Sequence, residues 1–78
     1  MYEMSVIGIR KVEGTNKSTG RAYSGWNVFV TYENKYVDGL ASERLYLSDA
    51  KMPQNLGVGS VVRPYYNRFG QIEMLEVL

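Results

Sequence analysis

The chain has 78 residues, with nine Lys and Arg against eight Asp and Glu, and contains neither Cys nor His. This length predicts one domain with a small core, a size at which dimerisation often supplies additional burial. Without thiols and imidazoles, disulfides, Ser-His and Cys-His catalysis and nearly all zinc sites are excluded, so we expect no enzyme, no cofactor and no metal. No apolar run suits a signal peptide or a membrane span, which predicts a cytoplasmic protein with no membrane partner.

The N-terminal part of the chain predicts two long strands joined by a polar turn. Residues 2–12 are rich in Val, Ile and Met, and their alternation places Ile7 and Ile9 on one face. Residues 13–20 are turn-forming types throughout. From residue 22 to residue 32, small or apolar side chains alternate with the others in a period of two, which predicts a second strand with Trp26 facing the core.

The middle of the chain is less regular. Residues 33–35 indicate a turn, and residues 37–47 predict either a third strand or an interrupted pair of strands, with Asp38-Gly39 as the break. The only candidate for a helix is 48–56, which Pro53 limits to about one turn.

Two further strands are predicted at the C-terminal end. Residues 60–66 form the fourth strand, where Pro64 indicates a sheet edge or a bulge because proline cannot donate to a ladder. Residues 67–70 turn the chain into a fifth strand over 71–77. In that strand Ile72 and Met74 share one face while Leu75 and Val77 share the other, which indicates a bulge or burial on both sides.

Five short strands without room for crossover helices predict an all-β fold, a small five-stranded antiparallel barrel. The succession of a long strand, a glycine-rich loop, two more strands, an irregular stretch and a closing hairpin favours an OB-fold-like barrel over an SH3-like one. We therefore expect a single OB-fold-like domain over residues 1–78.

The segment KSTGRAYSGW, residues 17–26, combines two cations, two glycines and two aromatic rings. A protein that holds single-stranded DNA without reading its sequence needs cations for the phosphates and flat rings for the bases. Lys17 and Arg21 are therefore candidate phosphate contacts, and Tyr23 is a candidate for base stacking. Each stacked base contributes roughly 1–3 kcal/mol, so a few rings suffice even on a nearly neutral protein.

Further candidates lie outside this segment. Phe69 is predicted at a hairpin tip with little core to reach, which suits stacking or a dimer contact, and Arg68 beside it is a candidate phosphate contact. If the second and third strands are neighbours, Arg44 and Tyr46 can share a groove with Tyr23. Arg10 and Lys11 on the first strand are two further candidates.

The motifs Gly20-Arg21-Ala22-Tyr23-Ser24 and Tyr66-Asn67-Arg68-Phe69-Gly70-Gln71-Ile72 resemble those of the gene V type helix-destabilising proteins of filamentous phages. The chain also looks like small single-stranded DNA-binding proteins of phages and conjugative elements. This resemblance implies an OB-fold homodimer that coats single-stranded DNA, in which Arg21 matches a lysine, Tyr23 the stacking tyrosine and Phe69 the hairpin phenylalanine. Ala22 stands where the family has proline, Gly25 replaces an apolar residue, and the hairpin that contributes to the family's dimer is shorter.

The sequence therefore predicts a non-sequence-specific single-stranded DNA-binding protein that serves DNA replication or transfer of a phage or mobile element and forms a homodimer, with RNA as an alternative ligand. A second interpretation is a protein-interaction module that uses Tyr23, Trp26, Phe69 and the Tyr65-Tyr66 pair as its patch. A third is an RNA-binding barrel of the cold-shock kind, although the aromatic-rich strand motif of that family is missing. Salt dependence separates a strand binder from an aromatic protein interface.

Overall fold

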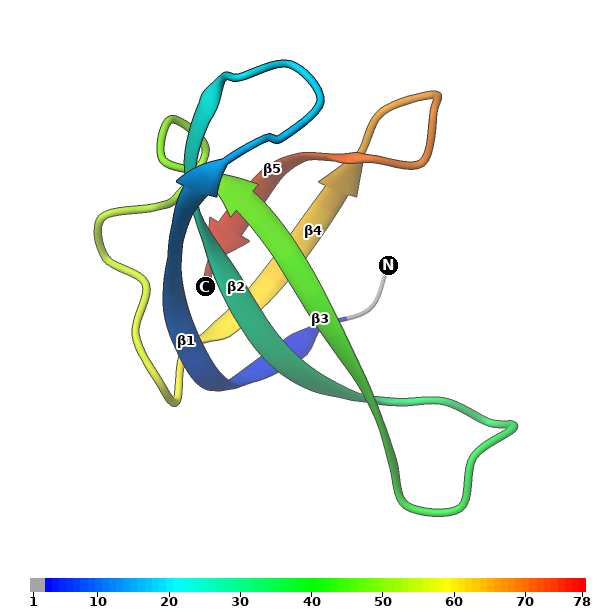
Figure 1. The fold of residues 1–78 in the computed structure, drawn as a ribbon. Coiled ribbons are helices and arrows are strands. Elements are labelled where there is room, and N and C mark those ends of the chain that lie inside the picture. Colours follow the sequence, from blue (N-terminus) through cyan, green and yellow to red (C-terminus); the bar gives the residue numbers. More distant parts are fainter. Residues whose placement is uncertain (1–2) are drawn as a thin grey trace.

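The computed structural model describes residues 3–78, which form one antiparallel sheet of five strands and no helix. The strands are β1 (Met4–Thr15), β2 (Ala22–Glu33), β3 (Leu40–Ser48), β4 (Val61–Tyr66) and β5 (Ile72–Val77). Their order in the sheet is β3-β2-β1-β4-β5, so the long strand β1 lies at the centre (Figure 1). The predicted all-β class, antiparallel pairing and five strands are confirmed.

The central strand β1 pairs with β2 over most of its length and with β4 only near its start, where Ser5 lies between Thr31 and Val61. The β1–β2 register shifts between Val6 and Gly8, which leaves Ile7 outside the ladder and 58% exposed. The expectation that Ile7 and Ile9 share a face is therefore wrong, because the bulge turns Ile7 outward.

The sheet curls strongly, and Figure 1 shows β1 bending through the fold. This curvature brings parts of the two edge strands, β3 and β5, within 8 Å of each other at their Cα atoms. No ladder joins β3 to β5 in the described part of the chain, so both remain edge strands.

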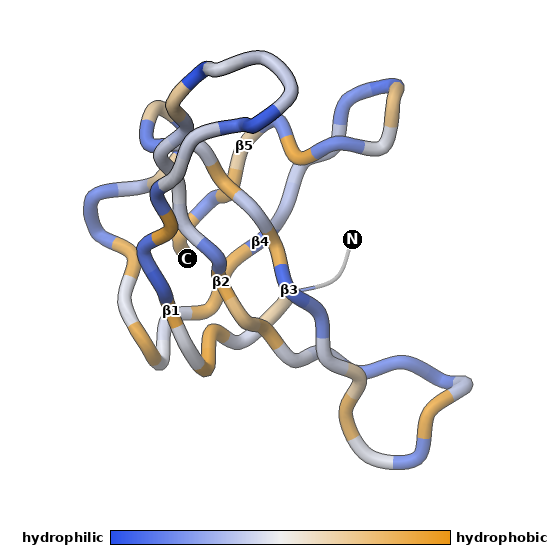
Figure 2. The backbone as a smooth tube through the Cα atoms, viewed as in Figure 1, coloured by the Kyte–Doolittle hydropathy of each residue, from blue (hydrophilic) through white to orange (hydrophobic). Residues whose placement is uncertain are grey.

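The core consists of apolar side chains on the inner face of the curled sheet: Met4, Val6, Val28, Val30, Leu45, Leu47, Val62 and Leu75. Full burial of an aliphatic side chain contributes about 1.5–3 kcal/mol, so this small set carries much of the stability. The predicted alternation of β2 is confirmed at Val28 and Val30, whereas Trp26 is only half-buried. Figure 2 shows hydrophobic residues concentrated on the strands and a largely hydrophilic loop between β1 and β2.

The connection from β3 to β4 contains no helix, contrary to the candidate over 48–56. The backbone nitrogens of Lys51 and Met52 both donate to the carbonyl oxygen of Ser48, at 3.0 and 3.1 Å, and this single turn ends before Pro53. Met52 and Leu56 from this connection pack against the core instead.

Pro64 lies within β4, opposite Leu75 of β5, and is buried. It is not on a sheet edge, since β4 lies between β1 and β5. The β1–β4 ladder ends at Val62 and does not reach Pro64. The missing backbone N–H of Pro64 therefore costs this ladder no hydrogen bond. The predicted irregularity of the last strand is confirmed, because Tyr65 faces Met74 whereas Tyr66 faces Ile72.

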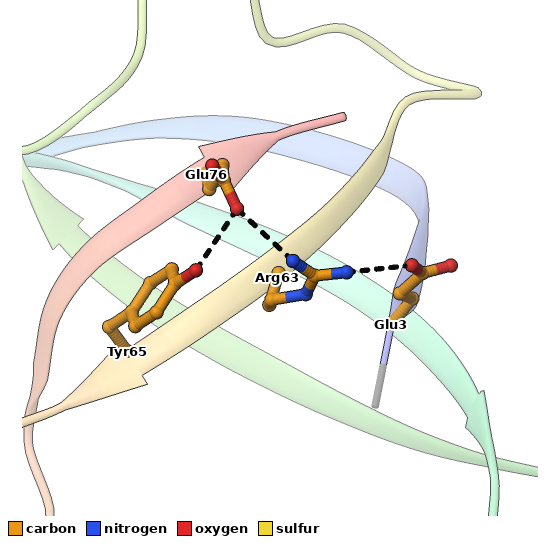
Figure 3. A network of polar contacts seen from close by, with 4 residues as sticks. All are labelled: Glu3, Arg63, Tyr65 and Glu76. Atoms are coloured by element: carbon orange, nitrogen blue, oxygen red, sulfur yellow. Dashed lines mark hydrogen bonds and ion pairs between the residues drawn. The ribbon is translucent and has the colours of Figure 1, made fainter. Parts of the chain in front are cut away.

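A polar network on the outer face links Glu3, which directly precedes β1, to β4 and β5 (Figure 3). The Arg63 guanidinium lies 3.0 Å from a carboxylate oxygen of Glu3 and 3.6 Å from one of Glu76. The hydroxyl of Tyr65 donates to the same Glu76 oxygen at 3.1 Å. Hydrogen bonding to Tyr65, followed by that to Glu3, raises the pKa of Arg63, which therefore stays charged.

Candidate nucleic-acid interface

The outer face of β1, β2 and β3 gathers the predicted site residues of the strands. Because Val28 and Val30 point into the core, Asn27 and Phe29 point outward. Two rows of paired residues then cross the three strands on this outer face: Gly8, Phe29 and Arg44, and next to them Arg10, Asn27 and Tyr46. Tyr23 follows on the same face, paired with Gly14.

The aromatic rings of this face lie over glycines of the neighbouring strand. A side-chain carbon placed on Gly14 would come within 2.5 Å of the Tyr23 hydroxyl oxygen, and one placed on Gly25 would collide with the Tyr46 ring. Phe29 covers Gly8 in the same way, at an ordinary contact distance of 3.5 Å. Glycine therefore lets the rings approach the sheet closely while Tyr23 and Tyr46 each remain 50% exposed.

The cations of this face are free to meet a ligand. The side chains of Arg10 and Arg44 are exposed and form no ion pair or side-chain hydrogen bond with residues 3–78. Arg44 lies opposite Phe29, and Arg10 is separated from Tyr46 by Asn27. Arginines and aromatic rings thus lie close together on this face. Arginines can contact the phosphates of a nucleic-acid strand, and the rings can stack on its bases.

Phe29 and Asn27 extend the site beyond the sequence prediction. Phe29 is half-buried between Gly8 and Arg44, and Asn27 lies between Arg10 and Tyr46. The signal was present in the alternation of β2, since both residues share the parity of Tyr23. Alternation alone does not distinguish a binding role for these two outer-face residues from ordinary cross-strand packing, because their neighbours on the adjacent strands depend on the register.

The loop between β1 and β2 carries Lys17 and Arg21 beyond the Tyr23 end of this face (Figure 1). Asn16 organises the loop: its side-chain oxygen accepts from the Ser18 nitrogen at 2.8 Å, and its carbonyl oxygen accepts from Gly20 at 2.7 Å. Gly20 has a φ of 71°, which an L side chain rarely adopts. The exposed side chains of Lys17 and Arg21 make no ion pair with the described residues, so a well-defined turn presents two unengaged cations.

Phe69 and Arg68 occupy the tip of the β4–β5 hairpin, as predicted. The Asn67 side-chain oxygen accepts from the backbone nitrogens of Phe69, at 2.9 Å, and Gln71, at 3.0 Å, which fixes the turn. Phe69 is 72% exposed, and the Arg68 guanidinium lies 5.0 Å from the centre of its ring. The ring contributes little to the core, so it is available for a ligand.

A groove of about 450 Å³ connects the outer face to the hairpin. It runs between β3 and the β4–β5 hairpin and is lined by Glu43, Arg44, Leu45, Tyr46, Ser48, Lys51, Tyr66, Gly70, Gln71 and Ile72. Arg44 and Tyr46 belong to both the face and the groove, so the two form one continuous surface. Neither residue of the Tyr65-Tyr66 pair is a core residue: Tyr65 is half-buried, and Tyr66 is 43% exposed in this groove.

Lys11 and Trp26 lie away from this surface. The Lys11 ammonium is 2.6 Å from a carboxylate oxygen of Asp49 and 4.8 Å from the centre of the Trp26 ring. Hydrogen bonds from Lys11 and then from Ser24 lower the pKa of Asp49. This cluster fastens the β3–β4 connection to β1 and β2. Lys11 thus makes a structural contact, and Trp26 does not share a face with Tyr23.

The fold and this surface define a small all-β protein with a curled sheet and a basic, aromatic outer face. The chain matches no protein-family model, no curated protein and no solved structure. Within residues 3–78, no group of three or more potential metal-binding side chains lies together, and no helix is long and apolar enough to cross a membrane.

Proposed function

We propose that this protein binds single-stranded DNA without sequence specificity, in the manner of the gene V type proteins that its motifs resemble. The observation that carries the proposal is the outer face of β1, β2 and β3, where the half-exposed rings of Tyr23 and Tyr46 lie near unpaired arginines. Aromatic rings stack on any base, and arginines contact any phosphate, so such a surface holds a strand irrespective of its sequence.

In this proposal the strand crosses the sheet from the β1–β2 loop toward the β4–β5 hairpin. Lys17 and Arg21 contact phosphates at one end, Arg10 and Arg44 contact them across the sheet, and Arg68 does so at the other end. Bases stack on Tyr23, Tyr46 and Phe69. Because every contact is with the backbone or a ring face, the protein coats a strand and reads no base edges.

We further propose that the curled sheet is an OB-fold-like barrel. The central strand pairs with both β2 and β4, and the edge strands β3 and β5 approach each other, as a five-stranded barrel with one open seam requires. In such barrels the face of the second and third strands and the adjoining loops bind oligonucleotides. On this basis the protein acts in the cytoplasm on DNA replication or transfer intermediates of a phage or mobile element.

The test is titration of the protein into a fluorescently labelled single-stranded oligonucleotide and into its duplex, followed by anisotropy at two salt concentrations. We expect preferential binding to the single strand, with log K falling against log salt by about 0.7 per phosphate contacted. Binding to neither form at low salt contradicts the proposal and favours a protein partner for the same aromatic residues. A matched RNA oligonucleotide in the same titration decides between DNA and RNA.

A further inference from the structure

The groove between β3 and the β4–β5 hairpin lies at an open seam of the sheet. In the described part of the chain β3 and β5 are both edge strands, and no ladder joins them. The lining includes the consecutive residues Glu43 to Tyr46, so the groove runs along the free edge of β3 and both faces of that strand contribute to it. Its volume of about 450 Å³ lies within the range of about 300–1,000 Å³ that is typical of sites for small organic ligands.

Two tyrosines border this groove from different strands. Tyr46 is an outer-face residue of β3 and is 50% exposed, whereas Tyr66 is the last residue of β4 and is 43% exposed. Tyr66 pairs with Ile72 directly after the register shift that follows Tyr65. The groove therefore has aromatic surface at two borders, which is what stacking of a flat base requires.

A lysine of the β3–β4 connection is positioned at the same groove. Lys51 belongs to the lining, and its ammonium donates to the Ile72 carbonyl oxygen at 3.1 Å. It forms no ion pair within residues 3–78. An ammonium group has three donors, so two of them are left for an anion. The hydrogen bond to Ile72 thus holds a cation beside the two rings.

The charges of the lining favour an anion at the outer border of the groove. Arg44 lies on the outer face, exposed and without an ion pair among the described residues, and Lys51 supplies a second cation. The only carboxylate of the lining is that of Glu43, which shares the parity of the buried Leu45 and so belongs to the opposite face of β3. A phosphate at the Arg44 border is therefore separated from this carboxylate by the strand.

We propose that the groove is a subsite for one nucleotide of the bound strand, an inference that rests on the proposed single-strand binding. Beyond Tyr46 one base leaves the outer face and enters the seam, where it stacks on the Tyr66 ring while Lys51 contacts its phosphate. A base of a duplex must first be unpaired and unstacked, a cost that is smallest in a single strand. The subsite therefore adds Tyr66 and Lys51 to the binding residues and favours a single strand over a duplex.

Removal of the ring from the protein, and of the bases from the ligand, tests the stacking. In anisotropy titrations Tyr66→Ala is expected to bind a short labelled oligonucleotide about 5- to 150-fold more weakly, and Tyr66→Phe, which retains the ring, to bind it like the wild type. On a strand of equal length whose residues are all abasic, Tyr66→Ala should match the wild type, because no base is left to stack. Tyr36→Ala, which removes an 84% exposed ring outside the groove, is the control.

Two results would overturn the stacking on Tyr66. One is wild-type affinity of Tyr66→Ala for the intact oligonucleotide, and the other is an equal loss on the intact and the abasic strands. Circular dichroism of each variant shows whether the sheet is retained.

Removal of the lysine charge tests the phosphate contact without changing the ring. Lys51→Met retains most of the apolar stem and should flatten the slope of log K against log salt by about 0.7, on the intact and the abasic strands alike, because both carry the phosphates. Lys35→Met, which removes a cation outside the groove, should keep the wild-type slope. A wild-type slope in Lys51→Met refutes the phosphate contact in the groove.

The same titrations separate the subsite from the proposed function. Tyr66→Ala should lower the ratio of single-strand to duplex affinity, because it removes a contact that a paired base does not make. A wild type that binds no oligonucleotide refutes the proposed function itself. A wild type that binds single strands, with Tyr66→Ala and Lys51→Met both unchanged, refutes the subsite alone and upholds the outer face as the binding surface.

Discussion

Tyr23 and Tyr46 are placed on the outer face by the glycines beneath them. In an ordinary strand pair, a side chain on the neighbouring strand would occupy the space that Gly14 and Gly25 leave empty. Each ring therefore lies against backbone on one side and remains half-exposed on the other. A base stacked on such a ring gains contact area while the protein loses little side-chain freedom on binding.

Removal of these rings is expected to weaken single-strand binding. We expect Tyr23→Ala, Tyr46→Ala and Phe69→Ala each to cost about 1–3 kcal/mol, or roughly 5- to 150-fold in affinity, with the fold retained. Anisotropy titration with a short oligonucleotide measures the loss. Tyr36→Ala, which removes an 84% exposed ring on the β2–β3 loop, is the matched control. Unchanged affinity in Tyr23→Ala, Tyr46→Ala and Phe69→Ala removes stacking as the mechanism.

The arginines of the site are expected to determine salt sensitivity. Because Arg21 and Arg44 make no ion pair within the described residues, each is available to displace one counterion from DNA. Arg21→Ala and Arg44→Ala should each flatten the slope of log K against log salt by about 0.7. Lys35→Ala, which removes a cation from the β2–β3 loop outside the proposed DNA path, should keep the wild-type slope. A slope that either arginine variant shares with the wild type demotes that residue to a solvated charge.

At the scale of the strand, β2 and β3 depend on Gly25 for their close approach. A side-chain carbon at this buried position would lie 2.7 Å from the Leu47 carbonyl oxygen, a backbone atom that cannot swing away, and would also collide with Tyr46. At Gly14 the atoms in the way are the distal ring atoms of Tyr23, which can rotate. Gly25 therefore permits the close packing of β2 against β3, whereas Gly14 leaves room for the Tyr23 ring.

This difference predicts that substitution of Gly25 mainly lowers stability, whereas substitution of Gly14 mainly lowers single-strand binding. Gly25→Ala is expected to destabilise the fold by about 1–3 kcal/mol through overpacking. Gly14→Ala is expected to change stability by less than about 1 kcal/mol yet to weaken single-strand binding, because it displaces Tyr23. Urea unfolding and anisotropy measure the two effects. Gly57→Ala is the control, since nothing lies within 4 Å of a side chain there and its φ is ordinary. Equal stability of Gly25→Ala and Gly57→Ala contradicts the argument.

At the scale of the whole molecule, the Asp49 cluster links the long β3–β4 connection to the first two strands. The Lys11 ammonium and then Ser24 lower the pKa of Asp49 below its ordinary value of 3.8, so the folded protein holds the carboxylate ionised where the unfolded chain would protonate it. The resulting stabilisation is present above pH 3.8 and is lost as the pH falls through the lowered folded pKa.

Acid should therefore destabilise the wild type more than Asp49→Asn. Thermal melting at about pH 6 and about pH 3 is expected to show a larger fall in Tm for the wild type, since the variant lacks the carboxylate whose protonation weakens the fold. Asp38 is exposed on the β2–β3 loop and forms no ion pair within residues 3–78, so Asp38→Asn should show the same fall in Tm as the wild type. An identical fall in Tm for the wild type and Asp49→Asn contradicts a stabilising role for the cluster.

Local sequence patterns were enough to predict the all-β class and the five strands, because period-two alternation and turn-forming residues are local properties of the chain. It placed β2 and the Asn67–Gly70 turn correctly, together with the exposed Phe69. The predicted face of Ile7 is wrong, because a bulge between Val6 and Gly8 turns this side chain outward. The helix candidate over 48–56 is also wrong, and Met52 and Leu56 of this segment pack against the core from an irregular connection.

Which candidate residues share a surface depends on how the strands pair. Strand register brings Arg10, Arg44 and Tyr46 onto one face, and it sends Lys11 to the other side with Asp49. A one-residue shift in register reverses every side chain of a strand, so alternation alone does not fix a face. Alternation predicts that Phe29 lies on the same face of β2 as Tyr23, but its neighbours Gly8 and Arg44 and the ring–glycine contacts depend on the pairing of strands. Pairing between distant segments is set by the packing of the whole sheet.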